Sequence, residues 1–284
     1  MLAAIAFPPF LKPNLIEWPI PVKWYGLAYV GGLLFAAWYI KRLVSKPALW
    51  GKWKPAMTPL QVDEMFVWFF LGVVGGGRLG YVLLYQPAKY LADPLGIFKV
   101  WDGGMSFHGG FLGVVIACYF YGRKVGATLD RMLDLGAAAV PVGLGLGRLA
   151  NFINAELYGR YTDVPWAVIF PGDTQGRHPS QLYEAGLEGI VLFLILRLAT
   201  HRFHLLPRRG AVTGLFMACY GLFRIMLETV RNPDLNMPNY PFGLTMGMIL
   251  STPMVLAGLA LFWYASRPLD GEAEAVAAPD APAI

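Results

Sequence analysis

Charged residues are scarce in this sequence of 284 residues. Asp, Glu, Lys and Arg together make up 14% of it, whereas soluble domains usually carry about 25%. Hydrophobic residues make up 56%, and the mean hydropathy is +0.50. These values exclude the acidic, intrinsically disordered class, because disordered chains combine few apolar residues with a high net charge. They also argue against a single soluble core, which would not need so few charges.

Cysteine is almost absent. The two cysteines, Cys118 and Cys219, both lie inside apolar runs. This pattern lacks the paired spacing of a zinc site and the dense set of cysteines that marks a disulfide framework. We therefore interpret both as small, buried hydrophobic side chains.

Apolar runs are what the sequence has in quantity. A helix that crosses a bilayer needs about 20 mostly apolar residues. Helices are favoured because backbone groups in hydrocarbon must pair within the chain, and a β-barrel would show alternation instead. The sequence therefore predicts an all-α, polytopic membrane helix bundle with about seven transmembrane helices. The predicted spans are residues 24–43, 62–85, 107–121 (a short one), 132–153, 182–199, 212–230 and 242–264.

Basic residues lie mainly in the short loops between these runs, which explains the net charge of +5 without a nucleic-acid partner. Lys and Arg collect in cytoplasmic loops, and here they concentrate after the first, third and fifth predicted spans. We therefore predict that the N-terminus lies outside and the C-terminus inside the cell. The predicted parts are an extracytoplasmic arm (1–23), a transmembrane domain (24–266) with an outer loop subdomain at about 154–181, and a disordered cytoplasmic tail (267–284).

Few ionisable residues lie inside the predicted spans, and the predicted orientation brings them to the outer halves. Such residues are functional candidates, because a charge in hydrocarbon is costly. Three arginines there suggest an anionic ligand, since Arg holds phosphate through paired hydrogen bonds. At this depth we expect a phospholipid headgroup. The set comprises Arg78, Arg148, Glu184, Glu188, Arg224 and Glu228, with Tyr25 and His108 at the outer starts of two spans.

Structural explanations compete with functional ones at several of these positions. Arg224 and Glu228 are four residues apart, so they could simply neutralise each other. Arg78 could extend outward to the headgroups, and His108 could be an ordinary loop histidine. A functional site is favoured more strongly at Arg148, because further polar residues follow it at the end of the same predicted helix.

Glycines recur at the spacing of helix contacts. Gly72, Gly76 and Gly80 are four residues apart, and so are Gly143 and Gly147. Small residues at this spacing let helices approach closely in lipid, so we expect packing contacts there. The glycines that follow His108 would instead let a ligand approach the backbone. They are Gly109, Gly110 and Gly113.

Four separated motifs give the chain a family resemblance. GRLANFINAELYGR covers residues 147–160, and the others are SFHGG at 106–110, HPSQLYE at 178–184 and FRIMLETVRNPD at 223–234. Together they resemble the bacterial prolipoprotein diacylglyceryl transferase family, from about the first predicted span to the seventh. Ala150 and Ala155 depart from it, because the family usually has glycine at both positions. If either position needs a positive φ, alanine would be strained there.

The resemblance implies a membrane enzyme that moves the diacylglyceryl group of phosphatidylglycerol onto a cysteine thiol. The acceptor would be the lipobox cysteine of a preprolipoprotein. A thioether would form and glycerol 1-phosphate would leave, without a metal or other cofactor. Both substrates would enter through lateral openings between helices. We expect the enzyme in the bacterial cytoplasmic (inner) membrane, with its active site facing the extracytoplasmic side.

The resemblance also suggests roles for the motif residues. Arg148 and Arg224 would bind the headgroup phosphate. Asn151 and Glu156 would bind headgroup or glycerol hydroxyls and orient Arg148. His108 would take the proton of the substrate thiol, because imidazole titrates near working pH.

Further contacts would support these groups. Glu228 would hold Arg224 or share the thiol proton. The remaining predicted headgroup contacts are Tyr25, Arg78, Gly159, Gln181 and Glu184.

Two other functions fit arginines among apolar helices. A transporter or channel for an anionic solute would need polar residues along a complete path, but the inner halves of the predicted spans are nearly all apolar. A lipid-binding assembly factor without catalytic activity would tolerate the loss of His108.

Overall fold

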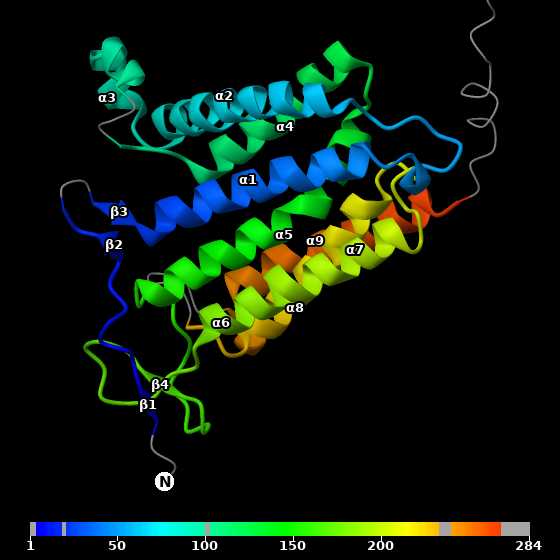
Figure 1. Ribbon diagram of the computed structural model, residues 1–284. Coiled ribbons are helices and arrows are strands. Elements are labelled where there is room, and N and C mark those ends of the chain that lie inside the picture. Colours follow the sequence, from blue (N-terminus) through cyan, green and yellow to red (C-terminus); the bar gives the residue numbers. More distant parts are fainter. Residues whose placement is uncertain (1–3, 19–20, 100–102, 233–239, 268–284) are drawn as a thin grey trace, which may run out of the picture.

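The computed structural model describes residues 4–18, 21–99, 103–232 and 240–267, and within them the chain is mainly helical (Figure 1). Each predicted span coincides with helix, which confirms the helical prediction. Six of these helices are α1 (Trp24–Val44), α2 (Pro59–Leu84), α4 (Phe107–Val125), α5 (Leu129–Ile153), α8 (Ala211–Glu228) and α9 (Met246–Ala265). The fifth predicted span is built from three consecutive elements, α6 (Ser180–Glu184), the π-helical η4 (Ala185–Val191) and α7 (Leu192–His201).

Five of these helices, namely α1, α2, α5, α8 and α9, are long and apolar enough to cross a membrane. The finding is consistent with a multi-pass membrane protein. Helix α4 is not among the five, and the fifth predicted span is divided by its π-helical segment into shorter elements. The count of seven spans and their orientation therefore stay predictions.

The ends of the bundle differ in their structure (Figure 1). One end, here called the strand end, carries the start of α1 and the short strands of the described residues. The opposite end carries the α1–α2 and α7–α8 connections. The strand end also holds α3 (Pro87–Ala92) and the 3-10 helix η2 (Pro94–Phe98). Two further 3-10 helices are η1 (Pro47–Leu49) and η5 (Pro241–Gly243).

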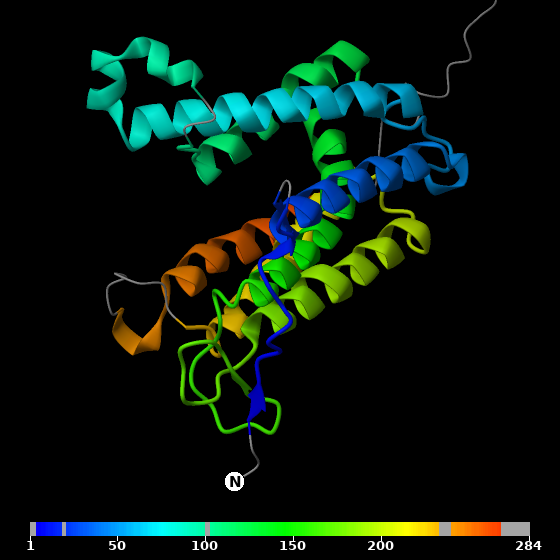
Figure 2. The same ribbon diagram turned by 60° about the vertical axis from the view of Figure 1, so that its left-hand side comes forward.

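Helices α2 and α4 form a close pair along one side of α1 (Figure 2). Their backbones meet at glycines. A methyl group on Gly76 would lie 2.8 Å from the Cα of Gly113, and one on Gly80 would lie 2.7 Å from the Cα of Gly109. The predicted packing role of Gly72, Gly76 and Gly80 is confirmed. The interpretation of Gly109 and Gly113 as an approach for a ligand is wrong, because α2 occupies that space.

The rest of the bundle is built from helix pairs around α5, which contacts α1, η4, α7 and α8. Gly143 confirms its predicted packing role, since a methyl group on Gly32 of α1 would lie 2.9 Å from the Gly143 Cα. Gly147 does not, because a methyl group there would have open space around it. Helix α8 pairs with α9.

The opposite end holds most of the buried apolar core. Large side chains that are almost fully buried there include Tyr39, Leu43, Trp50, Tyr121, Leu135 and Leu196. One buried carboxylate, Asp134 of α5, fixes the start of α8, because it accepts hydrogen bonds from the backbone nitrogens of Gly210 (2.7 Å) and Thr213 (2.8 Å). Of the two predicted buried cysteines, Cys118 is buried and Cys219 is partly so; both are free thiols.

The N-terminal arm pairs with the loop that precedes α6. Strand β1 (Ile5–Ala6) runs parallel to β4 (Val168–Ile169), and β2 (Asn14–Ile16) runs antiparallel to β3 (Val22–Lys23). The ring of Phe7 lies 5.5 Å from the rings of both Phe152 and Phe170. The arm therefore ties the loop to the end of α5. The predicted tail lies almost entirely outside the described residues.

The α2–α4 contact predicts a steric test. Replacing Gly113 by Ala should lower the free energy of unfolding of the purified protein by about 1–3 kcal/mol, because the methyl group would overpack against the α2 backbone. The melting temperature should fall accordingly. Gly75→Ala on α2 is the matched control. Nothing lies near its added methyl group, so it should be neutral or stabilising through helix propensity. Equal melting temperatures for the two variants would contradict the contact.

Candidate functional site

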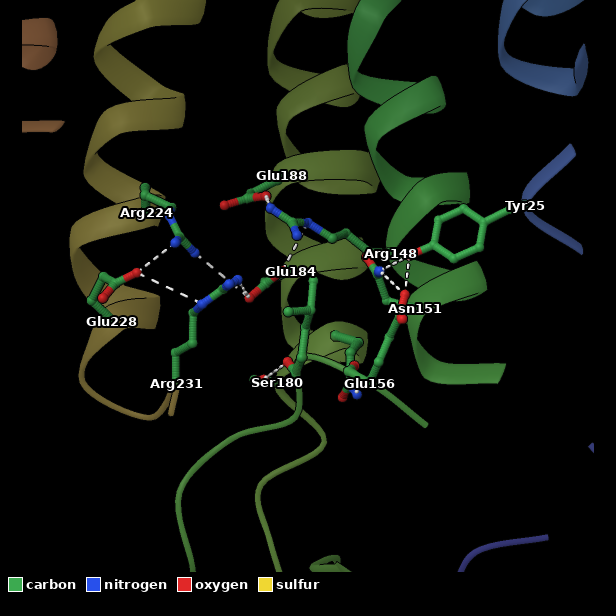
Figure 3. Close-up of polar contacts among 12 residues, drawn as sticks. Tyr25, Arg148, Asn151, Glu156, Ser180, Glu184, Glu188, Arg224, Glu228 and Arg231 are labelled. Carbon is green, nitrogen blue, oxygen red and sulfur yellow. Dashed lines mark hydrogen bonds and ion pairs between the residues drawn. The ribbon is translucent and has the colours of Figure 1, made fainter. Parts of the chain in front are cut away.

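Six charged side chains from α5, α6, η4 and α8 or its end meet at the strand end of the bundle (Figure 3). We call them the charged cluster. Arg148 comes from α5, Glu184 ends α6, and Glu188 lies in η4. Helix α8 supplies the other side of the cluster, with two residues in its last turns and one just beyond its end. These are Arg224, Glu228 and Arg231.

Glu184 is the shared partner of the three arginines. Its Oε2 lies 2.8 Å from Arg148 Nε, while its Oε1 lies 3.0 Å from Arg231 Nη1 and 3.7 Å from Arg224 Nη1. The Glu184 side chain is fully buried. A buried carboxylate is stable only with partners, so three guanidinium groups are held around this one residue.

The other two glutamates complete the pairing. Glu228 Oε1 lies 2.5 Å from Arg224 Nη2 and 3.9 Å from Arg231 Nε. Glu188 Oε2 accepts a 3.4 Å hydrogen bond from Arg148 Nη2. Three arginines and three glutamates carry formal charges that sum to zero. The predicted neutralisation of Arg224 by Glu228 is thus present, within a larger network.

The arginines differ in how open they are. The side chains of Arg148 and Arg224 are 19% and 15% exposed, against 8% for Arg231. Within the described part of the chain, Arg224 Nη1 has no hydrogen-bond acceptor. Arg148 and Arg224 are therefore the more accessible arginines of the cluster.

A hydrogen-bonded group of polar residues lies beside the cluster. The Tyr25 hydroxyl donates to Glu156 Oε1 and accepts from Asn151 Nδ2. Asn151 Nδ2 also lies 2.9 Å from the same Glu156 oxygen, and Gln181 Nε2 donates to the Glu156 backbone oxygen at 2.6 Å. We expected Asn151 and Glu156 to orient Arg148, but their hydrogen bonds instead connect the start of α1, the end of α5 and α6.

Arg78 lies elsewhere. Its side chain is buried and donates to backbone oxygens of the segment that follows α3, among them Gly96 at 2.7 Å and Ile97 at 2.8 Å. Lys99, Gly103 and Gly104 provide the other acceptors. The interpretation of Arg78 as a side chain extending to the headgroups is wrong, since its guanidinium organises this segment.

His108 lies in the first turn of α4, and its side chain is exposed. Helix α4 pairs with α2, whereas the charged cluster is built from α5, α6, η4 and α8. We predicted that His108 lies near the arginines because the predicted orientation brings them all to the outer ends of their spans. Its role as a base stays a prediction.

Gly159 connects the loop to the end of α8 through its backbone. Its nitrogen donates to the His178 oxygen at 2.9 Å, and Gly159 bridges to Arg231 in a short antiparallel pairing. A methyl group here would lie 2.7 Å from the His178 Cβ. Arg160 then donates from Nε to the Arg231 oxygen at 2.8 Å. Gly159 thus helps to fix where Arg231 enters the cluster.

The loop itself is held by an ion pair outside the helices. Arg177 donates to Asp173 from Nε at 2.6 Å and from Nη2 at 3.2 Å. These hydrogen bonds lower the pKa of the Asp173 carboxyl. The guanidinium also lies 3.8 Å from the ring centre of Tyr161. Because the pKa of the Asp173 carboxyl is lower in the folded protein, the Arg177–Asp173 pair stabilises the fold at neutral pH. This stabilisation is lost as the pH falls through the pKa that Asp173 has in the folded state.

The sequence analysis includes Glu188 among the charged candidates and Arg231 in a motif, but it predicts no contact or role for either residue. Spacing was the available signal, because Glu188 follows Glu184 by four residues and Arg231 follows Glu228 by three. The π-helical stretch η4 begins directly after Glu184 and contains Glu188. Such stretches occur frequently at functional sites.

The two alanine departures differ in backbone conformation. Ala150 lies within α5, whereas Ala155 has a φ of 51°. A Cβ in this left-handed region costs about 1–2 kcal/mol. The strain expected for a glycine position occupied by alanine is therefore present at Ala155, between the end of α5 and Glu156.

Apolar helices long enough to cross a membrane, with buried charges gathered at one end, define a multi-pass membrane protein with a polar site. The family model described as prolipoprotein diacylglyceryl transferase matches residues 13–264. The chain belongs to the prolipoprotein diacylglyceryl transferase family, and it is a transferase.

Curated relatives agree over most of their length, and each carries the name phosphatidylglycerol–prolipoprotein diacylglyceryl transferase. The relative from Caulobacter sp. (strain K31) is 50% identical, with 90% of this chain and 92% of the relative covered. That from Phenylobacterium zucineum is 50% identical, covering 92% and 94%. That from Brucella anthropi is 51% identical, covering 93% and 95%.

The strained alanine predicts opposite effects for two small substitutions. Ala155→Gly should stabilise the protein by about 0.5–1 kcal/mol, because relief of the left-handed strain exceeds the entropy that glycine adds to the unfolded chain. Ala150→Gly should destabilise it by about 0.5–1 kcal/mol, because this residue is helical. Thermal unfolding in one detergent measures both. A lower melting temperature for Ala155→Gly would contradict the assigned strain.

Proposed function

We propose that this chain transfers the diacylglyceryl group of phosphatidylglycerol to the lipobox cysteine of preprolipoproteins. The sulfur would attack a glyceryl carbon, the carbon–oxygen bond to phosphate would break, and glycerol 1-phosphate would leave. The product is a thioether, formed in the first step of lipoprotein maturation. Membership of the family supports the proposal, as do relatives whose names include both substrates.

The proposal includes an orientation in the bacterial cytoplasmic membrane. Seven spans would place the strand end, with the charged cluster, on the extracytoplasmic side and the C-terminus inside. The basic connections at the opposite end support this orientation, because Lys and Arg favour the cytoplasmic side. They include Lys41, Arg42, Lys46, Arg123, Lys124, Arg202, Arg208 and Arg209.

The observation that carries the proposal is the pair of partly exposed guanidinium groups in the charged cluster. Arg148 and Arg224 are the most exposed cations of the cluster, and Arg224 Nη1 is a buried donor without a hydrogen-bond acceptor among the described residues. A phosphate oxygen that enters beside these two side chains would supply an acceptor. Donors fixed before the substrate arrives stabilise the charge that develops on the leaving phosphate.

Neighbouring acceptors would hold the glycerol part of the headgroup. Gln181 Oε1 and Glu188 Oε1 are buried oxygens without hydrogen-bond donors within the described residues. Glycerol hydroxyls would donate to such oxygens. The hydrogen-bonded group of Tyr25, Asn151 and Glu156 lies beside the charged cluster. It would exclude headgroups that are larger than glycerol phosphate.

The thiol proton must leave, because thiolate is the nucleophile. We assign its removal to His108, with Glu228 holding Arg224 beside the phosphate. No cofactor is part of this scheme. The substrates would enter laterally from the membrane, since both carry apolar segments.

Arginine substitution tests the phosphate site. Arg148→Ala should lower transfer of labelled diacylglyceryl from phosphatidylglycerol to a lipobox peptide by about 100-fold or more, as is typical when a donor to developing charge is removed. The control is Arg123→Ala, because Arg123 lies at the opposite end and donates to Tyr119. Membrane insertion and yield of both proteins should match wild type. Near-normal turnover by Arg148→Ala would refute the assignment.

A pH–rate profile tests the base. His108→Gln should lower transfer and change the pH dependence of the transfer rate, because glutamine cannot accept the thiol proton. A lipobox peptide with serine in place of cysteine gives the background. If the variant keeps the wild-type pH profile, His108 is not the base.

A further inference from the structure

A second feature of the structure lies at the end of the bundle opposite the charged cluster. A groove of about 490 Å³ runs between α7, the start of α8 and the end of α9. Most of its lining is apolar, including Leu198 and Phe203, which are 54% and 62% exposed. The groove is thus an open apolar surface next to polar chain connections. Its lining also includes Ile195, Leu205, Leu215 and Phe262.

One cation forms part of this lining. Arg208 borders the groove together with Ser266, and its Nη1 donates to the Ser266 backbone oxygen at 3.0 Å. This hydrogen bond fixes the guanidinium where α9 ends and the apolar surface begins. A ligand that follows the groove would therefore meet a positioned arginine at one end.

The surrounding chain carries positive charge without nearby acids in sequence. No Asp or Glu occurs between Glu188 and Glu228 or along α9. Asp134, which contacts the start of α8, already accepts hydrogen bonds from Gly210 and Thr213. The neighbouring basic residues at this end are Arg197, Arg202, Arg209 and Arg267.

We propose that this groove binds an anionic phospholipid, with an acyl chain along the apolar lining and the phosphate at Arg208. Basic pockets between membrane helices on the cytoplasmic side are suited to anionic headgroups. Assigning the lipid to the inner leaflet rests on the membrane orientation given under the proposed function. The binding site itself does not depend on that orientation. This site is distinct from the substrate site at the charged cluster, because the two lie at opposite ends of α8.

Two other occupants are less well matched. The chain beyond Arg267 is acidic but carries few large apolar residues. It therefore complements the positive charge of Arg208 but not the apolar lining of the groove. A second copy of the protein would bring its own arginines against Arg208. A phospholipid complements both the apolar lining and the cation.

Native mass spectrometry of the purified full-length protein tests the site with phosphatidic acid as the probe and phosphatidylcholine as the zwitterionic control. Arg208→Gln should weaken phosphatidic acid binding about fivefold, the worth of one basic residue near an anionic lipid. Arg123→Gln, in another connection at the same end, should leave binding unchanged. Equal affinity in wild type and Arg208→Gln would overturn the proposal.

Filling the groove provides an independent test. Leu198→Trp should reduce phosphatidic acid binding by blocking the acyl chain, whereas Leu256→Trp should not, because Leu256 is exposed on α9 and lies outside the lining. Unchanged binding in Leu198→Trp overturns the groove. Lipid binding that appears only after residues 268–284 are deleted would also overturn the proposal, because the C-terminal chain would then occupy the groove. A dimer that Leu198→Trp dissociates would overturn it as well, because a second copy would then be the occupant. These readouts do not use transfer activity, so they fail or succeed separately from the proposed function.

Discussion

The contact of one buried carboxylate with three guanidinium groups constrains the whole strand end. Glu184 is fully buried, and its two oxygens lie near Arg148, Arg224 and Arg231. Removing one partner from a buried ion pair leaves an uncompensated charge and costs several kcal/mol. Helices α5, α6 and α8 must therefore meet at this point. The arginines are kept in place before any anionic ligand binds, which is the preorganisation that electrostatic catalysis needs.

The remainder of the bundle keeps these helices in position. Glycine contacts bring α1 against α5, and Gly189 of η4 approaches Gly145 of α5, where an added methyl group would lie 2.7 Å from the opposing Cα. At the other end of α8, Asp134 fixes the first residues of the helix. Helix α8 is therefore secured at both ends, by a carboxylate of α5 at its start and by Glu184 near its end.

The sequence predicted the helices because long apolar runs in a membrane protein have few alternatives. It also predicted that Arg148, Arg224 and Glu228 converge, since span order alone places them at one end. It did not predict the carbonyl partners of Arg78 or the pairing of the N-terminal arm with residues 168–169, because those contacts join segments whose relative positions depend on tertiary structure. The glycines after His108 were misinterpreted for the same reason, since both packing and ligand approach favour small residues.

The proposed transferase site depends on Glu184 to hold its arginines in place. The most direct measurement is the transfer rate of Glu184→Gln, which keeps the side-chain shape and removes the charge, compared with wild type in the same detergent. We expect the transfer rate to fall by about 100-fold or more, because the arginines would be misplaced, and the melting temperature to be lower than that of wild type. A variant that is less stable but transfers at the wild-type rate would show that the cluster is structural and that the site lies elsewhere.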